Sequence, residues 1–162
     1  MRSDLRGLGR SFVYAWQGLC YCVRHERNFR IHLVAAACAL CLAWRLELGG
    51  LELAVLAGTI ASVLVLELVN TAVEAVVDHL SPERSPWAKI AKDTAAGAVL
   101  VCAAASVAVG FWLLWRPREL AALAVFLLTT PWAFLLALFA AGLGLAFIFL
   151  PGRGRDKGEE KG

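Results

Sequence analysis

The sequence predicts an all-α membrane protein, in which an amphipathic N-terminal helix lies on the membrane surface and is followed by a bundle of transmembrane helices. Hydrophobic residues make up 60% of the 162 positions, and the mean hydropathy is +0.68, far from the balance of a soluble domain. Long segments without any charge are separated by short stretches that hold Gly, Pro or charged residues. Several of these segments reach the roughly 20 apolar residues that a helix needs to cross a bilayer. We therefore expect no soluble domain within the chain.

The N-terminal region, residues 1–30, is basic and amphipathic. Phe12, Trp16, Leu19 and Val23 recur at helical spacings, and arginines and other polar residues stand between them. A basic helix with aromatic residues on its apolar side is typical of a helix that lies at a membrane surface. The region has no uninterrupted apolar core, so we expect no cleavable signal peptide.

The first two spans are expected on either side of a glycine turn. Ile31 to Leu48 is the first, and the charge of Arg45 can reach the far interface from its last turn. Gly49-Gly50 predicts a tight turn. The second span runs from about Leu51 to about His79, a length of about 43 Å, so its last turns should project beyond the hydrocarbon.

The third and fourth spans follow a short loop. Ser85-Pro86 is a typical helix start, with Ser as the N-cap and Pro at the first helical position. The helix carries no charge from Thr94 to Trp115, which is long enough for a span. Leu120 to Leu150 is also free of charge but contains Pro131, so one long kinked or tilted span or a tight hairpin could use it. The tail, 151–162, is Gly-rich and charged, and we expect it to be disordered.

The distribution of positive charge decides between the span and the hairpin. With four spans, the segments 1–30, 79–94 and 151–162 lie on one side of the membrane and hold most of the 16 Lys and Arg residues. Positive charge is enriched on the cytoplasmic side of membrane proteins. We therefore expect four spans with both termini in the cytoplasm.

A polar stripe ends the second span. Glu67, Asn70, Thr71, Glu74 and Asp78 follow an apolar run, and no Gly or Pro ends the helix between them. At 100° per residue these side chains fall in one narrow sector of the helix. Ionisable groups in a membrane-embedded helix are costly and indicate a functional site. The alternative interpretation is a polar seam that packs one helix against another.

The charged residues expected at the cytoplasmic face match the needs of phosphoryl transfer, although the nucleotide-binding motifs of soluble proteins are absent from the sequence. Glu26 precedes the first span, Glu74 and Asp78 end the second, and Lys92-Asp93 enters the third. Carboxylates from two helices can hold Mg²⁺, and a lysine can neutralise phosphate charge. A separate, deeper carboxylate such as Glu67 can take a proton from a hydroxyl.

Two other interpretations were weighed. The same acidic residues could form a proton or cation path of a small transporter, but the stripe occupies only the cytoplasmic half of the membrane and the other spans hold no acidic residue in their middles. The cysteine pairs Cys20/Cys22 and Cys38/Cys41 have spacings seen in metal or redox sites, but no His or second Cys pair is expected at ligand distance from either pair. We expect all five cysteines to be structural.

Three motifs carry a resemblance to a known family. They are His25-Glu26-Arg27-Asn28-Phe29-Arg30-Ile31-His32, the pattern E-x-x-N-[ST]-A-x-E from Glu67 through Asp78, and Ala91-Lys92-Asp93 with Ala95 to Leu100. Over roughly residues 6–116 the chain resembles the prokaryotic integral-membrane lipid kinases, the diacylglycerol kinase and undecaprenol kinase family. The form of the motifs is more similar to the undecaprenol-phosphorylating branch.

The resemblance implies a three-span kinase core over 31–116 in a bacterial cytoplasmic membrane, assembled as a homotrimer with active sites shared between neighbours. It implies transfer of the γ-phosphate of Mg-ATP to a lipid hydroxyl, with undecaprenol as the expected acceptor and diacylglycerol as the alternative; no nucleic-acid partner is expected. By matching motif, Glu67 is the general base, and Glu26 and Glu74 bind Mg²⁺. The residues expected to contact the nucleotide or line its site are Tyr14, Asn70, Asp78, Glu83, Ser85, Lys92, Asp93 and either Arg10 or Arg6.

The chain departs from the family in its C-terminal segment, 117–150, because the family usually stops after the third span. The added span could pack at the periphery of the trimer and change lipid access, or it could be a tolerated extra helix.

Overall fold

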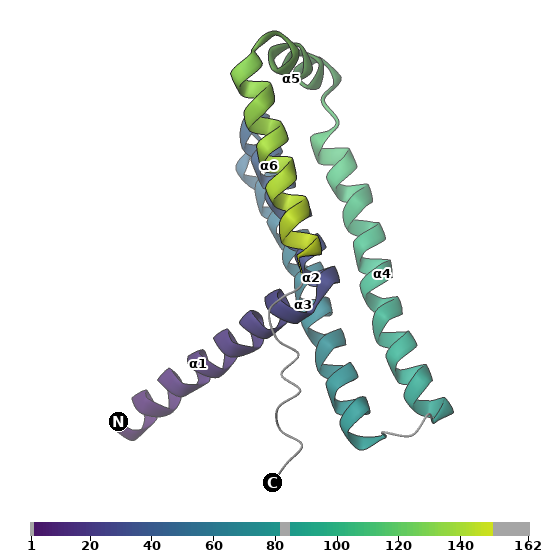
Figure 1. The fold of residues 1–162 in the computed structure, drawn as a ribbon. Coiled ribbons are helices and arrows are strands. Elements are labelled where there is room, and N and C mark those ends of the chain that lie inside the picture. The colour runs from purple at the N-terminus through teal and green to yellow at the C-terminus, as the bar shows by residue number, and fades with distance from the viewer. Residues whose placement is uncertain (1, 82–84, 151–162) are drawn as a thin grey trace.

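The computed structural model describes residues 2–81 and 85–150, with side chains from residue 7 onward. Within these residues the chain is entirely helical, which confirms the predicted fold class. Figure 1 shows the six helices: α1 (Arg2–His25), α2 (Arg27–Arg45), α3 (Gly50–Leu80), α4 (Pro86–Leu114), α5 (Pro117–Thr129) and α6 (Pro131–Phe149). The predicted tail, 151–162, and Glu83 lie outside the described residues.

The bundle is built around α3 and α4, which form its most extensive helix pair. α2 packs along α3, α6 packs along α2, and α5 crosses the end of the bundle, while α1 projects from its side (Figure 1). The helices α3, α4 and α6 are long and apolar enough to cross a membrane, so this is a multi-pass membrane protein. α2 is less apolar because it holds Arg27, Arg30 and Arg45 within 19 residues, and its membrane span stays a prediction.

The first helix ends earlier than predicted from the sequence. The surface helix was expected to run to Arg30, but α1 ends at His25 and α2 begins at Arg27. Glu26 between them has extended backbone angles, φ −98° and ψ 110°. The chain changes direction between α1 and α2, and this change requires a break in the helix. Neither Gly nor Pro occurs at this position, so the local sequence does not predict the break.

Pro131 divides the segment that was expected to form one long span. Proline lacks an N–H group and pushes the residue before it into an extended conformation, as seen at Thr130, with φ −117° and ψ 93°. α5, with 13 residues, is about 20 Å long, too short for a hydrocarbon core of about 30 Å. Of the expected span over Leu120 to Leu150, only α6 is therefore long enough to cross the membrane. The connection between α4 and α5 is short, because α4 ends at Leu114 and α5 already begins at Pro117.

Arg116, just before α5, forms hydrogen bonds with the end of α2 and the start of α3. Its Nη1 donates to the Leu46 carbonyl at 3.1 Å, and its Nη2 donates to the Glu52 Oε1 and Oε2 atoms at 3.0 and 2.9 Å. Glu52 Oε2 also accepts from the backbone N–H of Gly49 at 2.9 Å.

We expect Arg116→Leu to lower the unfolding temperature, because it removes the hydrogen bonds of the guanidinium to the Leu46 carbonyl and the Glu52 carboxylate. Thermal unfolding in detergent measures the change. Arg118→Leu is the matched control, since Arg118 is exposed. Equal unfolding temperatures for the two variants would contradict the prediction.

Candidate functional site

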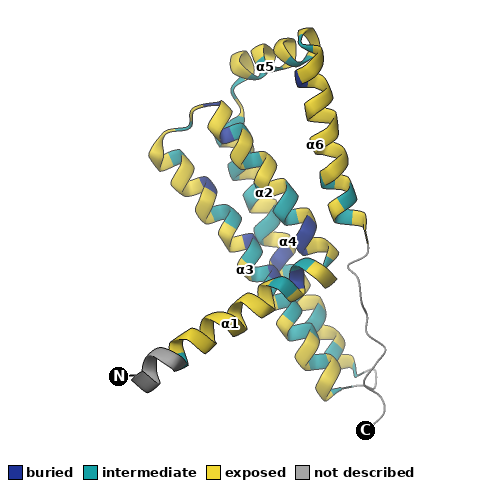
Figure 2. Cartoon of the chain, turned by 60° about the vertical axis from the view of Figure 1, so that its left-hand side comes forward, coloured by how far each residue is buried: buried dark blue, intermediate teal, exposed yellow. Residues whose placement is uncertain are grey.

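The polar stripe lies on α3 where this helix passes α1 and α2. Glu67 is only 4% exposed, although it carries a carboxylate. Figure 2 shows a group of buried residues where the end of α1 meets the bundle, and Cys22, Phe29 and Glu67 are all buried. A buried carboxylate requires a partner, and α2 supplies one.

His32 of α2 is that partner, and the sequence analysis had assigned it no role. Its Nε2 lies 3.3 Å from Glu67 Oε1. Between Arg30 and Arg45 it is the single ionisable side chain of α2 apart from two cysteines. That isolation on an apolar helix was the signal that could have identified it.

Asn70 and Glu74 continue the stripe one turn further along α3. Asn70 Nδ2 donates to Glu74 Oε1 at 2.9 Å, and Thr71 Oγ1 donates to the Glu67 carbonyl at 3.1 Å. The Asn70 Oδ1 atom is buried without a hydrogen-bond partner. Glu26 and Glu74 both lie near enough to Glu67 to interact with it electrostatically.

The last pair of the stripe joins α3 to α4. Lys92 Nζ donates to Asp78 Oδ1 at 2.8 Å and to Oδ2 at 3.1 Å. Asp78 and Lys92, which were both expected at the cytoplasmic face, thus form an ion pair between the two helices. Asp93 instead accepts from Lys89 at 3.0 Å on an exposed face. Ser85 occupies the N-cap position of α4 as expected, but its side chain makes no capping hydrogen bond.

The residues expected on α1 are not part of this cluster. Tyr14 is 66% exposed and Arg10 is exposed as well; both belong to α1, the helix that projects from the side of the bundle (Figures 1 and 2). Only the second half of α1 lies against α3, where Cys22 faces Thr71. The Arg6 side chain and Glu83 lie outside the described residues.

All five cysteines are free thiols. Cys22 is buried, and this burial raises the pKa of its thiol. A thiol with a raised pKa stays protonated and is a poor nucleophile and metal ligand. This environment supports a packing role for Cys22.

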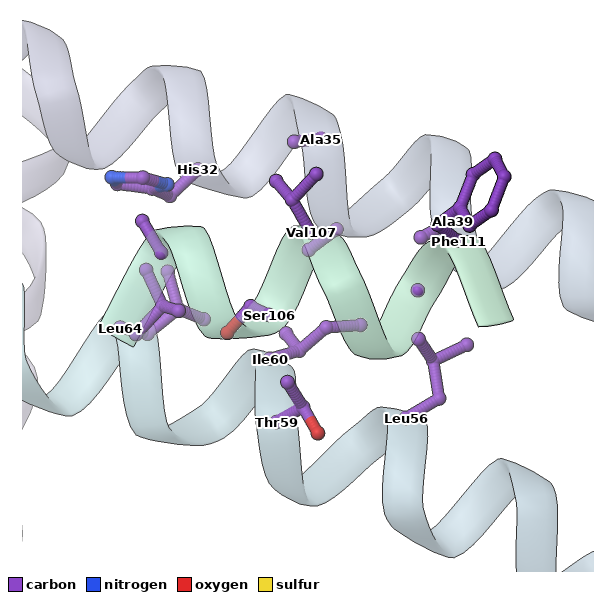
Figure 3. A pocket seen from close by; sticks show the side chains of 14 residues that line it. His32, Ala35, Ala39, Leu56, Thr59, Ile60, Leu64, Ser106, Val107 and Phe111 are labelled. Atoms are coloured by element: carbon purple, nitrogen blue, oxygen red, sulfur yellow. The ribbon is translucent and has the colours of Figure 1, made fainter. Parts of the chain in front are cut away.

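An apolar groove begins beside the His32–Glu67 contact. It lies between α2, α3 and α4 and encloses about 250 Å³. Figure 3 shows His32 at one end and Phe111 at the other, with small and aliphatic side chains between them. The only oxygen-bearing side chains in the lining are those of Thr59 and Ser106, so the groove suits a hydrocarbon chain.

The chemistry of the donor atoms fits a hard divalent cation. Glu26 and Glu74 offer carboxylates near Glu67, and the unpaired Asn70 Oδ1 is a further oxygen acceptor. Mg²⁺ takes one or two carboxylates and fills its other positions with water and phosphate oxygens. Within the described residues, no group of three or more His, Cys, Asp or Glu side chains is arranged to hold a metal, so an all-protein cage is not the arrangement found there.

Comparison with known proteins identifies the family. The family model for prokaryotic diacylglycerol kinase matches residues 13–114. A diacylglycerol kinase of Synechocystis is 48% identical over 108 residues, which cover 66% of this chain and 62% of that protein. The undecaprenol kinase of Bacillus subtilis is 39% identical over 117 residues, covering 72% of this chain and 94% of that protein. The diacylglycerol kinase of Escherichia coli is 32% identical over 102 residues, covering 63% and 84%.

The matched region contains the whole stripe, His32 and Lys92, and it ends with α4. α5 and α6 therefore lie outside it. No solved structure matches the chain. The motifs, the helical fold and the family match agree, and the chain belongs to the prokaryotic diacylglycerol kinase family of membrane lipid kinases.

Proposed function

We propose that this protein transfers the γ-phosphate of Mg-ATP to the hydroxyl group of undecaprenol in a bacterial cytoplasmic membrane. One observation carries the proposal: the buried Glu67 stands between two different environments. On one side, the groove that starts at His32 is apolar. On the other side, α3 continues to Glu74 and to the Asp78–Lys92 pair. A lipid kinase needs this junction of a hydrocarbon site and a phosphate site.

The acceptor chain lies in the groove, and its hydroxyl reaches Glu67. The carboxylate of Glu67 removes the hydroxyl proton as the oxygen attacks the γ-phosphate. His32 contacts one carboxylate oxygen, Oε1, which leaves Oε2 for the hydroxyl. The small side chains of α2 and α4 along the groove, including Ala35 and Gly110, leave space for the chain.

The nucleotide lies on the charged side of Glu67. Lys92 neutralises phosphate charge, and Asp78 holds the lysine in place through two hydrogen bonds. Glu26 and Glu74 would hold Mg²⁺, and the Asn70 amide oxygen, which has no hydrogen-bond partner, would be a further acceptor there. When bound, Mg²⁺ neutralises charge on the phosphate oxygens. The residues assigned to nucleotide contacts around this centre are Tyr14, Arg10, Glu83, Ser85 and Asp93.

A trimer with shared sites explains the position of α1. Tyr14 and Arg10 are exposed residues of α1, the helix that projects from the side of the bundle (Figure 1). In a homotrimer, the α1 helix of one subunit reaches the nucleotide of its neighbour. The proposed topology has both termini in the cytoplasm, in agreement with the distribution of positive charge.

Diacylglycerol is the second candidate acceptor. The Synechocystis relative, at 48% identity, is named diacylglycerol kinase, whereas the forms of the motifs favour undecaprenol. The deciding experiment offers both lipids in competition and follows labelled γ-phosphate from ATP in liposomes. A preference for diacylglycerol would overturn the acceptor assignment and keep the kinase. No transfer to either lipid, beside an active relative, would overturn the proposed function and favour the transporter interpretation.

We expect His32→Leu to lower kcat about ten- to a hundred-fold, because Glu67 loses the group that orients it. His32→Gln should restore much of the rate, since an amide N–H can donate to the carboxylate from a similar place. The KM for ATP should change little in both variants. Steady-state kinetics with the lipid acceptor measures these values, and equal losses for Gln and Leu would contradict the orienting role. Ser62→Ala, on the exposed side of α3, is the control.

A further inference from the structure

Arg30, in the first turns of α2, is buried against the end of α6. It is only 8% exposed, and its Nη1 donates to the carbonyl oxygens of Phe147 and Leu150 at 3.2 and 2.6 Å. These carbonyls end α6. A cation at the C-terminus of a helix satisfies carbonyl groups that have no partner within the helix and complements the helix dipole.

The end of α6 provides the partners of the Arg30 guanidinium. None of the ion pairs within the described residues involves Arg30, and its Nε is buried without a hydrogen-bond partner. A buried cation without a counter-charge is costly. The two carbonyl contacts therefore couple the stability of this turn of α2 to the presence of α6.

A close approach one turn further along α2 fixes the same contact. A Cβ atom at Gly144 of α6 would lie 3.3 Å from Val34 Cγ1, so the Val34 side chain must move by a few tenths of an ångström for alanine, and a bulky side chain such as leucine requires the helices to separate. At Gly142 a Cβ atom would meet nothing within 4 Å. Among the described helices, α6 contacts α2 and α5 alone, so α2 is its only link to the kinase core.

The turn of α2 that α6 holds also carries the site. Glu26 caps α2, and its carbonyl accepts from the Arg30 N–H at 3.3 Å. His32, the partner of Glu67, comes two residues after Arg30. A shift of this turn would move the metal carboxylate and the contact to the general base together.

We propose that α6 is a brace for the site-bearing turn of α2, and that Arg30 is the positioning residue through which the brace acts. The segment that lies outside the family match is then a part of the working kinase rather than an inert extra helix. The docking of α6 stands on the contacts alone, and its effect on phosphoryl transfer rests on the proposed function. In this arrangement the Arg30 guanidinium serves the α6 carbonyls, not a phosphate.

A double-mutant cycle in the full chain tests the proposal. Arg30→Met removes the contact from the α2 side, Gly144→Leu forces α6 away, and the double variant combines them. Gly142→Leu is the matched control, because its side chain enters open space. The measurements are the unfolding temperature in detergent, kcat for lipid phosphorylation and KM for ATP.

Each single variant should unfold at a lower temperature and lose about ten-fold in kcat, with little change in KM for ATP. The double variant should be no worse than either single variant, because both remove the same contact. Gly142→Leu should behave as the wild type.

If the losses in kcat of the two single variants multiply in the double variant, the proposed role of α6 is wrong. It is also wrong if Gly142→Leu and Gly144→Leu lower the unfolding temperature and kcat equally. A raised KM for ATP in Arg30→Met, both alone and combined with Gly144→Leu, would assign Arg30 to the nucleotide instead. Lower unfolding temperatures with an unchanged kcat would overturn the link to catalysis. If the wild type itself transfers no phosphate, the proposed function fails, and the unfolding temperatures alone then decide whether Arg30 docks α6.

Discussion

Glu67→Gln should reduce lipid phosphorylation by about a hundred- to ten-thousand-fold, the usual contribution of a general base, while binding of Mg-ATP largely survives. The amide keeps the shape of the side chain, and its oxygen remains at the position that faces His32 Nε2. It cannot accept the proton of the lipid hydroxyl. Because Glu67 acts on the acceptor, loss of its charge should not remove the groups that hold the nucleotide.

Two assays on the same preparation separate these effects. Transfer of labelled γ-phosphate to the lipid reports the reaction, and equilibrium binding of labelled ATP with Mg²⁺ reports the nucleotide site. Glu119→Gln is the control, since Glu119 is exposed on α5 and lies outside the family match. A Glu67→Gln enzyme that keeps its rate, or that loses ATP binding to the same extent as turnover, would contradict the assignment.

Glu74→Gln should show the opposite pattern and weaken the binding of Mg-ATP about ten- to a hundred-fold. The Asn70 amide donates to Glu74 Oε1, and the glutamine oxygen can still accept this hydrogen bond, so the local structure should persist. The carboxylate charge is lost, and charged interactions of this kind contribute about 1.5–3 kcal/mol, which corresponds to the stated change in affinity.

The dependence on Mg²⁺ provides the internal check. If Glu74 holds the metal, raising the Mg²⁺ concentration should recover part of the affinity of Glu74→Gln for ATP. It should recover nothing in Glu67→Gln, whose defect concerns the acceptor. Identical defects in both assays would mean that Glu67 and Glu74 do not have separate roles, and the division between base and metal ligand would be wrong.

The helices and their main breaks could largely be predicted from the sequence. The charge-free segments predicted α3 and α4, and Ser85-Pro86 predicted where α4 begins. The sequence also placed Asp78 and Lys92 at the same end of the bundle, because a short loop joins their helices, but their ion pair is a finding of the structure. Pro131 was expected to kink or tilt one long span, which the distribution of charge favoured over a hairpin. The structure shows a separate helix after Pro131, α6, which packs on α2.

The long-range partners of three charged side chains could not be predicted. His32 contacts Glu67, Arg30 contacts the end of α6, and Arg116 contacts Glu52. Each pair joins residues that are far apart in the sequence. Local periodicity places a side chain on a helix face, but it carries no information about which other helix lies against that face.

The sequence by itself determined the class of the protein, its family motifs and the stripe on α3, because helix formation, membrane insertion and helical periodicity depend on composition and spacing along one segment. Only the tertiary structure decided how the stripe is completed. A buried charge must find an oppositely charged or hydrogen-bonding partner, and α2 supplies these contacts through two residues, with His32 facing Glu67 and Arg30 facing α6. The choice of partner is set by how the helices pack.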